Sequence, residues 1–220
     1  MTIEESGGLL DFVTSLTGER YLKVEEVLGD GYVRLRVSEA ERRQAKHDIR
    51  SVEDVVVELL RNSRDANSSK IFVATYKEAN LQRKISVIDD GWGIPPSVQS
   101  KIFEPRVTAK LDNVVMDAYG VHGRGMALYS VKSAVENVEL VVSIPGKGSV
   151  FKVLIDTQKL PERKDQSTFP DVRVKNGQSK DFRGPHNIPR LLVEFGLEHP
   201  SLELYFGSPA EILATMFVLT

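Results

Sequence analysis

The segment VIDDGWGIP, residues 87–95, places two carboxylates and two glycines directly after an apolar run. A carboxylate at the end of a buried strand can accept a hydrogen bond from an exocyclic amine of a ligand. Gly91 and Gly93 allow a positive φ and a close approach of the backbone to that ligand. The segment therefore indicates a ligand site, and the alternative is an ordinary acidic turn after a strand.

A second segment, GVHGRGMALYSVK at residues 120–132, offers backbone amides in place of side chains. Gly120, Gly123 and Gly125 precede an expected helix start. The amides of such a loop and of the helix N-terminus together form a cradle for phosphate groups. The glycine spacing is neither that of a Walker loop nor that of a dinucleotide fingerprint.

A third segment, ELLRNSRDAN at residues 58–67, is expected to be helical. Glu58, Asn62 and Asp65 are spaced by four and three residues, so they lie on one stripe of the helix, displaced from its apolar stripe. The stripe should face a cleft, and the alternative is a solvated polar face. Asparagine has a poor propensity for helix interiors, which favours a specific role for Asn62.

The elements that must position these segments can be predicted from periodicity. Ser51 and Asp54 resemble a capping box, and Val52, Val55, Val56, Leu59, Leu60 and Ser63 follow at helical spacing. Residues 104–123 have no clean period and are expected to form a long loop. The other expected elements are a short helix at 7–16, strands within 20–37, a charged helix within 38–49, strands at 70–76 and 84–90, a helix from 95 to about 103, a helix beginning near 125, and a hairpin of strands at 138–144 and 149–155.

Composition bounds the class of protein. The chain has 220 residues, of which 41% are hydrophobic and 27% are charged, as in globular proteins. The formal net charge of −2 argues against a surface built entirely to coat nucleic acid. The sequence contains no cysteine, which excludes disulfides, thiolate metal sites and a cysteine nucleophile. No apolar run approaches a membrane span, and the acidic N-terminal region is unlike a signal peptide, so a cytoplasmic protein without a membrane partner is expected.

In this order and spacing, the three segments resemble the GHKL family of ATPases, which includes gyrase-type topoisomerase subunits, heat-shock chaperones, mismatch-repair ATPases and histidine kinases. Residues 58–67 resemble its N box, 89–95 its first glycine box, KIFEP at 101–105 the F box of histidine kinases, and 120–132 its second glycine box. The resemblance covers about residues 50–156. It implies an α/β fold of the Bergerat type, a two-layer sandwich with a mixed, largely antiparallel sheet.

The resemblance also implies ATP and Mg²⁺ as cofactors. Asn62 would ligate magnesium, Asp89 would accept the adenine amino group, and residues 104–123 would form the ATP lid. Trp92 departs from the small or polar residues common at its position, and it could stack near adenine or cover the rim of the pocket. The further residues expected at the nucleotide are Asp65, Ala66, Gly91, Gly93, Ile94, Thr108, Gly120, Val121, His122, Gly123, Arg124, Gly125 and Met126.

Two residues are expected to be catalytic. Glu58 occupies the N-box position at which a glutamate of the hydrolysing branch activates water; in histidine kinases an acid there serves phosphoryl transfer instead. Lys110, in RVTAK, resembles the lid lysine of mismatch-repair ATPases, which could neutralise the γ-phosphate, and the alternative is a solvated lysine. His47 precedes Asn62 by only 15 residues, which leaves no room for the dimerisation hairpin of a sensor kinase.

The expected organisation is an N-terminal extension at 1–40, the ATPase domain at 41–156, a charged linker or arm at 157–190 and a small apolar segment at 191–220. The expected function is an ATP-hydrolysing conformational switch that forms a homodimer on binding nucleotide and acts on a protein client. The alternatives are a histidine-kinase-like enzyme acting on a partner and a nucleotide-binding scaffold with little turnover. Residues 157–190 carry eight basic and four acidic residues, so DNA is a possible partner. The apolar C-terminal end would also suit the front of a longer protein.

Overall fold

The computed structural model describes residues 24–109, 115–117, 120–122, 125–175 and 179–219. The chain divides into two compact units. Unit 1 comprises Met1–Asp48 and Pro95–Ser133, and unit 2 comprises Ile49–Ile94 and Ala134–Thr220. The helix expected at residues 7–16 lies outside the described residues.

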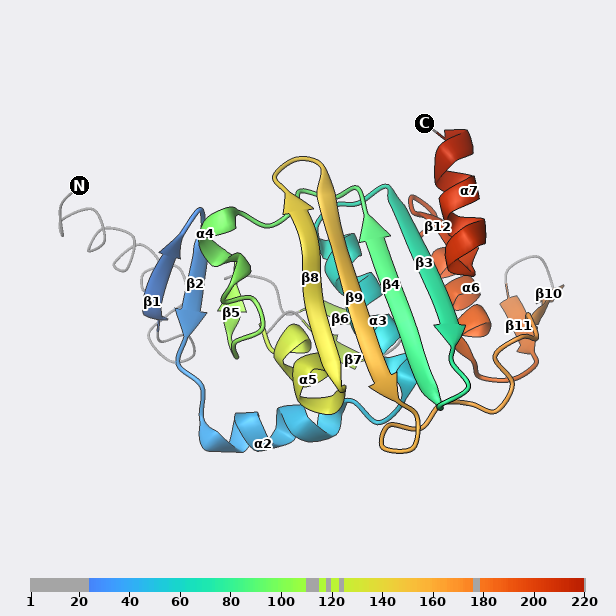
Figure 1. Ribbon diagram of the computed structural model, residues 1–220, viewed down its shortest axis with the longest axis horizontal. Helices are drawn as coiled ribbons and strands as arrows, with labels where there is room; N and C mark the ends of the chain where they lie inside the picture. The colour runs from blue at the N-terminus through green and yellow to red at the C-terminus, as the bar shows by residue number, and fades with distance from the viewer. Residues whose placement is uncertain (1–23, 110–114, 118–119, 123–124, 176–178, 220) are drawn as a thin grey trace. The chain divides into compact units, whose positions relative to one another are not determined.

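Unit 2 is built on a five-stranded sheet with the strand order β12-β3-β4-β9-β8 (Figure 1). Neighbouring strands pair antiparallel, except that β12 and β3 pair parallel. The sheet is therefore mixed and largely antiparallel, and this confirms the expected fold class. The strands are β3 (Lys70–Lys77), β4 (Gln82–Asp89), β8 (Asn137–Ile144), β9 (Gly148–Asp156) and β12 (Glu203–Gly207).

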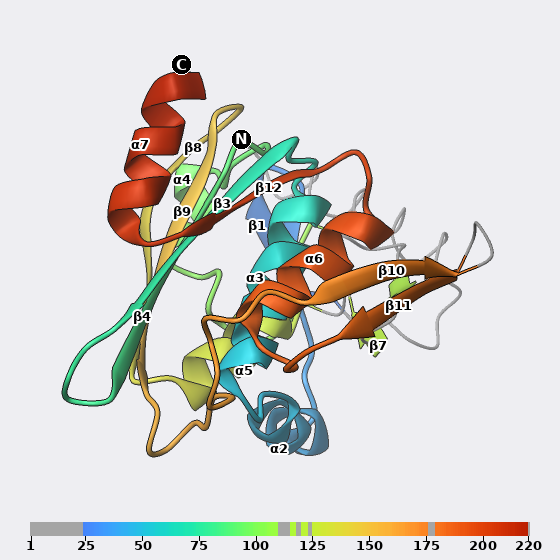
Figure 2. The same ribbon diagram turned by 90° about the vertical axis from the view of Figure 1, so that its right-hand side faces the viewer.

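Three helices of unit 2 cover this sheet, α3 (Val52–Asp65) and α6 (Ile188–Glu198) on one face and α7 (Pro209–Leu219) on the other (Figure 2). The expected capping box starts α3: the backbone N–H of Asp54 donates to Ser51 Oγ at 3.2 Å, and that of Ser51 donates to Asp54 Oδ2 at 3.0 Å. The apolar stripe that the sequence predicts for α3 is buried, because it faces the core of unit 2.

Strand β3 is buried on both of its faces. Phe72 and Ala74 form a cluster with Ile212 of α7. Ile71 and Val73, which alternate with them along the strand, are fully buried on the opposite face. Helix α7 therefore packs on one face of the sheet, and α3 and α6 pack on the other. At the edge formed by β12 and β3 the fold thus has more than two layers.

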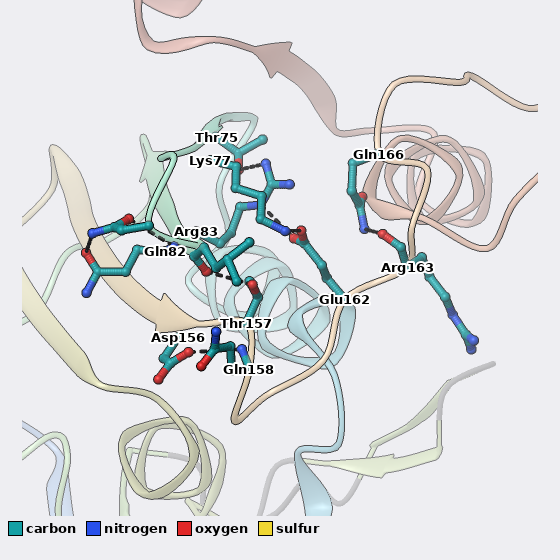
Figure 3. A network of polar contacts seen from close by, with 12 residues as sticks. Thr75, Lys77, Gln82, Arg83, Asp156, Thr157, Gln158, Glu162, Arg163 and Gln166 are labelled. Carbon is teal, nitrogen blue, oxygen red and sulfur yellow. Dashed lines mark hydrogen bonds and ion pairs between the residues drawn. The ribbon is translucent and has the colours of Figure 1, made fainter.

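The segment that follows β9 is tied to the rest of unit 2 by polar contacts (Figure 3). The Glu162 carboxylate accepts hydrogen bonds from Arg83 Nε at 2.8 Å and from Lys77 Nζ at 2.6 Å. The backbone N–H of Val52, at the start of α3, donates to the carbonyl of Pro161 at 3.0 Å. Composition led us to expect a linker or an arm here, whereas the structure anchors residues 157–163 on β3, β4 and α3 and forms the antiparallel pair β10 (Asp171–Lys175) and β11 (Ser179–Arg183) after them.

Replacing Glu162 with glutamine is expected to lower the free energy of unfolding by about 3 kcal/mol, since it leaves the buried Arg83 without its charge partner. Burial would raise the pKa of Glu162, but the hydrogen bonds from Arg83 and Lys77 lower it overall. A carboxyl pKa that is lowered by folding stabilises the folded chain at pH values above the pKa of the unfolded state. This stabilisation is lost as the pH falls through the pKa of the folded state. The difference between the two proteins should therefore shrink below about pH 4.

Urea unfolding at a series of pH values measures this difference. Glu139→Gln is the control, because Glu139 pairs with Lys152 at 3.4 Å on the exposed surface of the same sheet. It should cost less than about 1 kcal/mol. Equal losses for the two variants would show that the Glu162 contacts do not anchor the segment.

Unit 1 has a three-stranded sheet with the order β1-β2-β5, in which Val33 of β2 pairs with Thr108 of β5. The Arg34 guanidinium contacts the carboxylates of Glu26 and Glu104 and so joins β2 to β1 and to the segment before β5. Residues 104–123, expected as a loop, thus contain short strands, and the helix expected to reach residue 103 ends at Gln99. The elements are β1 (Val24–Gly29), β2 (Tyr32–Leu35), α2 (Glu39–Asp48), α4 (Pro96–Gln99), β5 (Val107–Thr108), β6 (Val115–Asp117), β7 (Gly120–His122) and α5 (Ala127–Ala134, whose last residue belongs to unit 2).

Within the part of the chain that the structure describes, no helix is both long enough and apolar enough to cross a membrane.

Candidate functional site

Asp89, at the end of β4, is held by hydrogen-bond donors from several segments of unit 2, among them the backbone N–H of Ser149. Its Oδ1 accepts from the Gly91 N–H at 2.9 Å and from Ser68 Oγ at 3.3 Å, and its Oδ2 accepts from Ser63 Oγ at 3.2 Å. The residue is only 6% exposed. Burial raises the pKa of Asp89, and the hydrogen bonds lower it by less. The side chain is thus a buried acceptor that is fixed by its hydrogen-bond donors.

Ser63 and Ser68 were not singled out as site residues from the sequence. Ser63 lies on the apolar stripe of α3, and Ser68 follows that helix. Ser68 Oγ also contacts the carbonyl of Ser63 at 2.6 Å, so the end of α3 and the end of β4 are joined through these two hydroxyls. A serine on the apolar stripe was the one signal in the sequence, because a buried hydroxyl requires a partner.

The glycine segment after Asp89 packs closely against its neighbours in unit 2. A Cβ atom on Gly91 would lie 2.7 Å from the carbonyl oxygen of Ala66 and 2.7 Å from Ser68 Oγ. Gly93 has a φ of +68°, and a Cβ atom there would lie 2.3 Å from the carbonyl oxygen of Ile144. Both positions therefore require glycine, because a Cβ atom would collide with the protein itself.

Trp92 is fixed through its backbone and exposed through its side chain. Its N–H donates to the carbonyl of Ala66 at 2.9 Å, and its carbonyl accepts from the N–H of Gly146 at 2.7 Å. The Trp92 side chain is 66% exposed. Ile94, the next expected site residue, donates its N–H to Ser143 Oγ at 2.7 Å. Hydrogen bonds thus join residues 92–94 to the end of α3 on one side and to the β8–β9 hairpin on the other.

Asn62 lies on the half-buried side of α3. Its Nδ2 atom is buried and has no hydrogen-bond partner among the residues that the structure describes. A buried amide nitrogen without a partner is rare in folded proteins and requires an explanation. Turned by half a rotation about its last bond, the same amide would present its oxygen to a cation.

The two acidic residues of the predicted stripe each contact an arginine of α3. Arg61 Nη1 donates to Glu58 Oε1 at 2.5 Å. Arg64 donates to Asp65 Oδ1 from Nε at 3.0 Å and from Nη2 at 2.9 Å. Neither pair was predicted from the sequence, although the i,i+3 spacing of Glu58 and Arg61 is a recognisable signal.

The remaining expected site residues belong to unit 1. Thr108 is buried in β5, and Gly125 has a φ of +67° and accepts a hydrogen bond from the Arg106 N–H at 2.8 Å. Met126 precedes α5, and Gly120, Val121 and His122 form β7. Lys110, Gly123 and Arg124 lie outside the described residues. A role of these residues in binding phosphates or closing over a nucleotide stays a prediction.

Comparison with known proteins gives one family match. The family model of histidine kinase-, DNA gyrase B-, and HSP90-like ATPases matches residues 47–159. The DNA mismatch repair protein MutL of Aquifex pyrophilus is 29% identical over 161 residues, which cover 71% of this chain and 31% of that protein. The signal transduction histidine-protein kinase AtoS of Escherichia coli (strain K12) is 32% identical over 107 residues, which cover 47% of this chain and 16% of that protein.

The chain thus spans less than a third of the length of these relatives. Among solved structures, the match to the N-terminal domain of a DNA repair protein covers 56% of this chain and 41% of that chain at 23% identity, with a TM-score of 0.39. The family model spans more than half of the 220 residues. The chain therefore belongs to the histidine kinase-, DNA gyrase B- and HSP90-like ATPase family.

Proposed function

We propose that this chain binds ATP with Mg²⁺ and hydrolyses it, and that it works as a nucleotide-driven conformational switch. The observation that carries the proposal is the buried Asp89 carboxylate, which is fixed at a strand end beside a glycine segment. A ligand amine that donates to this carboxylate would favour its charged form, which burial disfavours. The exocyclic amino group of adenine is a donor of this kind.

Asn62 is proposed to hold Mg²⁺ through its side-chain oxygen. The orphaned Nδ2 atom supports this, because the amide has a buried end that the described protein does not satisfy. An amide oxygen is a hard ligand of the kind that Mg²⁺ prefers. When bound, the ion neutralises charge on the phosphate oxygens.

Glu58 is proposed as the general base. It lies one turn before Asn62 on the same helix, so the two side chains share the stripe on which water, metal and phosphate would meet. A carboxylate within hydrogen-bond reach of the attacking water accepts its proton as the phosphoryl group is transferred. Lys110 is proposed to neutralise charge on the γ-phosphate.

Glu58→Gln is expected to lower the rate of phosphate release by about 10² to 10⁴, the range that general bases contribute. Its affinity for ATP should change little, because adenine and metal binding fall to other residues. The measurement is release of labelled phosphate from γ-labelled ATP with Mg²⁺, together with calorimetric titration of a non-hydrolysable ATP analogue.

Glu194→Gln is the control, since it removes a carboxylate from a comparable helix ion pair, Arg190–Glu194, on α6. It should leave phosphate release unchanged. Phosphate release at the wild-type rate from Glu58→Gln would exclude Glu58 as the base.

Phosphoryl transfer to a partner protein is the second candidate function. The KIFEP segment and the sequence match to a signal transduction histidine-protein kinase favour it. The same labelling experiment separates the two activities. Label retained on protein, with no free phosphate, would favour a kinase, whereas a chain that binds ATP and does neither would be a nucleotide-binding scaffold.

Partners are proposed from the family and from charge. We propose that nucleotide binding drives homodimer formation and that the protein then acts on a protein client. DNA is a further candidate, supported by the excess of basic over acidic residues in the segment 157–190. Light scattering with and without the ATP analogue tests the dimer, and the salt dependence of binding to duplex DNA tests the last proposal.

A further inference from the structure

Arg61 is a buried arginine beside the proposed general base. Its side chain is 6% exposed, and that of Glu58 is 18% exposed. The two residues are three positions apart on α3, so their side chains reach each other across one helical turn. The contact of 2.5 Å between Nη1 and Oε1 is a charge-assisted hydrogen bond.

This pair differs from the ion pairs of the surface. An exposed pair is screened by water and hardly restrains either side chain, as expected for Arg43–Glu39 on α2. A guanidinium in a buried position loses its hydration and requires a partner, so it holds the carboxylate that satisfies it. Arg61 therefore restricts Glu58 to the rotamers in which Oε1 meets the guanidinium.

Restriction matters for a general base, because proton transfer requires the acceptor oxygen to lie within hydrogen-bond reach of water. A glutamate has three rotatable side-chain bonds and, without an anchor, samples many positions on a helix. An anchor on one oxygen pre-organises the carboxylate before substrate binds, and a misplacement of about 1 Å can cost two orders of magnitude in rate.

We propose that Arg61 is a positioning residue that holds the Glu58 carboxylate for proton transfer in ATP hydrolysis. This inference rests on the proposed function, in which Glu58 is the base. Arg61 acts through Glu58 and is not assigned a contact with the nucleotide. Its removal should therefore slow turnover without weakening nucleotide binding.

A double-mutant cycle tests the inference in the full chain. The variants are Arg61→Met, which keeps an unbranched side chain of similar length, Arg61→Lys, which keeps the charge, Glu58→Gln, and the double variant Glu58→Gln with Arg61→Met. Arg190→Met is the matched control, because Arg190 pairs with a glutamate on α6. Each protein is measured for kcat and KM of phosphate release, for affinity toward the ATP analogue, and for the midpoint of thermal unfolding.

For Arg61→Met, kcat should fall about tenfold to a hundredfold, while the affinity for the analogue stays within about threefold. Arg61→Lys should recover most of the rate. In the Glu58→Gln background, Arg61→Met should have no further effect on kcat, since residues that act as one unit are not additive. Arg190→Met should match the wild type.

Three results would overturn the inference: an unchanged kcat in Arg61→Met, the same multiplicative loss with and without Glu58, or a loss of nucleotide affinity equal to the loss of rate. If Arg61→Met does not fold, Arg61→Lys alone and in the Glu58→Gln background completes the cycle. Failure of the proposed function has a different signature, because Glu58→Gln itself would then keep the wild-type rate.

Discussion

Asp89→Asn is expected to lower the affinity for ATP by about a hundredfold or more. The asparagine Oδ1 can keep the hydrogen bond from Gly91, and its Nδ2 can donate to Ser63 Oγ, so the folded site is preserved. The amide would then present a donor where the adenine amino group also donates. A site built for one hydrogen bond rejects a mismatched group strongly, because a buried polar group is left unpaired. Calorimetric titration with the non-hydrolysable analogue measures the loss.

Asp90→Asn is the matched control, one residue further along the chain. Asp90 accepts hydrogen bonds from the backbone N–H groups of Ser69 and Lys70 at 2.7 and 2.8 Å. Burial would raise the pKa of Asp90, but these bonds and the Ser69 hydroxyl lower it. The variant should lower stability by about 1 kcal/mol and leave affinity unchanged. Equal affinities for Asp89→Asn and the wild type would rule out Asp89 as the adenine acceptor.

The pH dependence of stability gives a second test of Asp89. Its pKa is raised in the folded chain, chiefly by burial. A raised carboxyl pKa stabilises the folded state at pH values below the ordinary pKa, and that contribution is lost as the pH rises through the raised value. Relative to Asp89→Asn, the ligand-free wild type should therefore lose unfolding free energy as the pH rises from about 4. Urea unfolding at a series of pH values measures this, and a flat difference would contradict it.

Among glycine-to-alanine substitutions in unit 2, Gly148→Ala is expected to lower the free energy of unfolding most. A Cβ atom at Gly148, whose φ is +100°, would lie 1.8 Å from the carbonyl oxygen of Asp89. No rotation relieves that overlap, so β9 and the end of β4 must move apart where Asp89 pairs with Ser149. We expect a loss of about 4 kcal/mol or more in the free energy of unfolding, and with it the loss of nucleotide binding.

Gly146→Ala separates backbone strain from collision in the same hairpin. Gly146 has a φ of +75°, and a Cβ atom there would meet nothing within 4 Å. Only the left-handed conformation then has a cost, about 1 to 2 kcal/mol. Denaturant unfolding of both variants measures the comparison, and similar losses would show that the close approach to Asp89 does not matter.

Much of the fold could be predicted from the sequence because the signals are local. The capping box of Ser51 and Asp54 and the apolar stripe after it predicted α3, and with it the common helix face of Glu58 and Asn62. The strands that became β3, β4, β8 and β9 were also predicted, with ends displaced by one to two residues. Short strands such as β5 were not predicted, because two residues carry no periodic signal.

The sequence by itself determined the family, the mixed α/β fold class, and the helix and strand that carry the expected acidic and amide side chains, since these depend on residues near one another in the chain. The partners of those side chains depended on the tertiary structure. Ser63 and Ser68 meet Asp89 from more than 20 positions away, and Glu162 reaches Arg83 across 79. Likewise, only folding brings Gly148 against the Asp89 carbonyl and β12 beside β3. Hydrogen bonds and steric contacts of this kind join distant segments, so neither spacing nor composition records them.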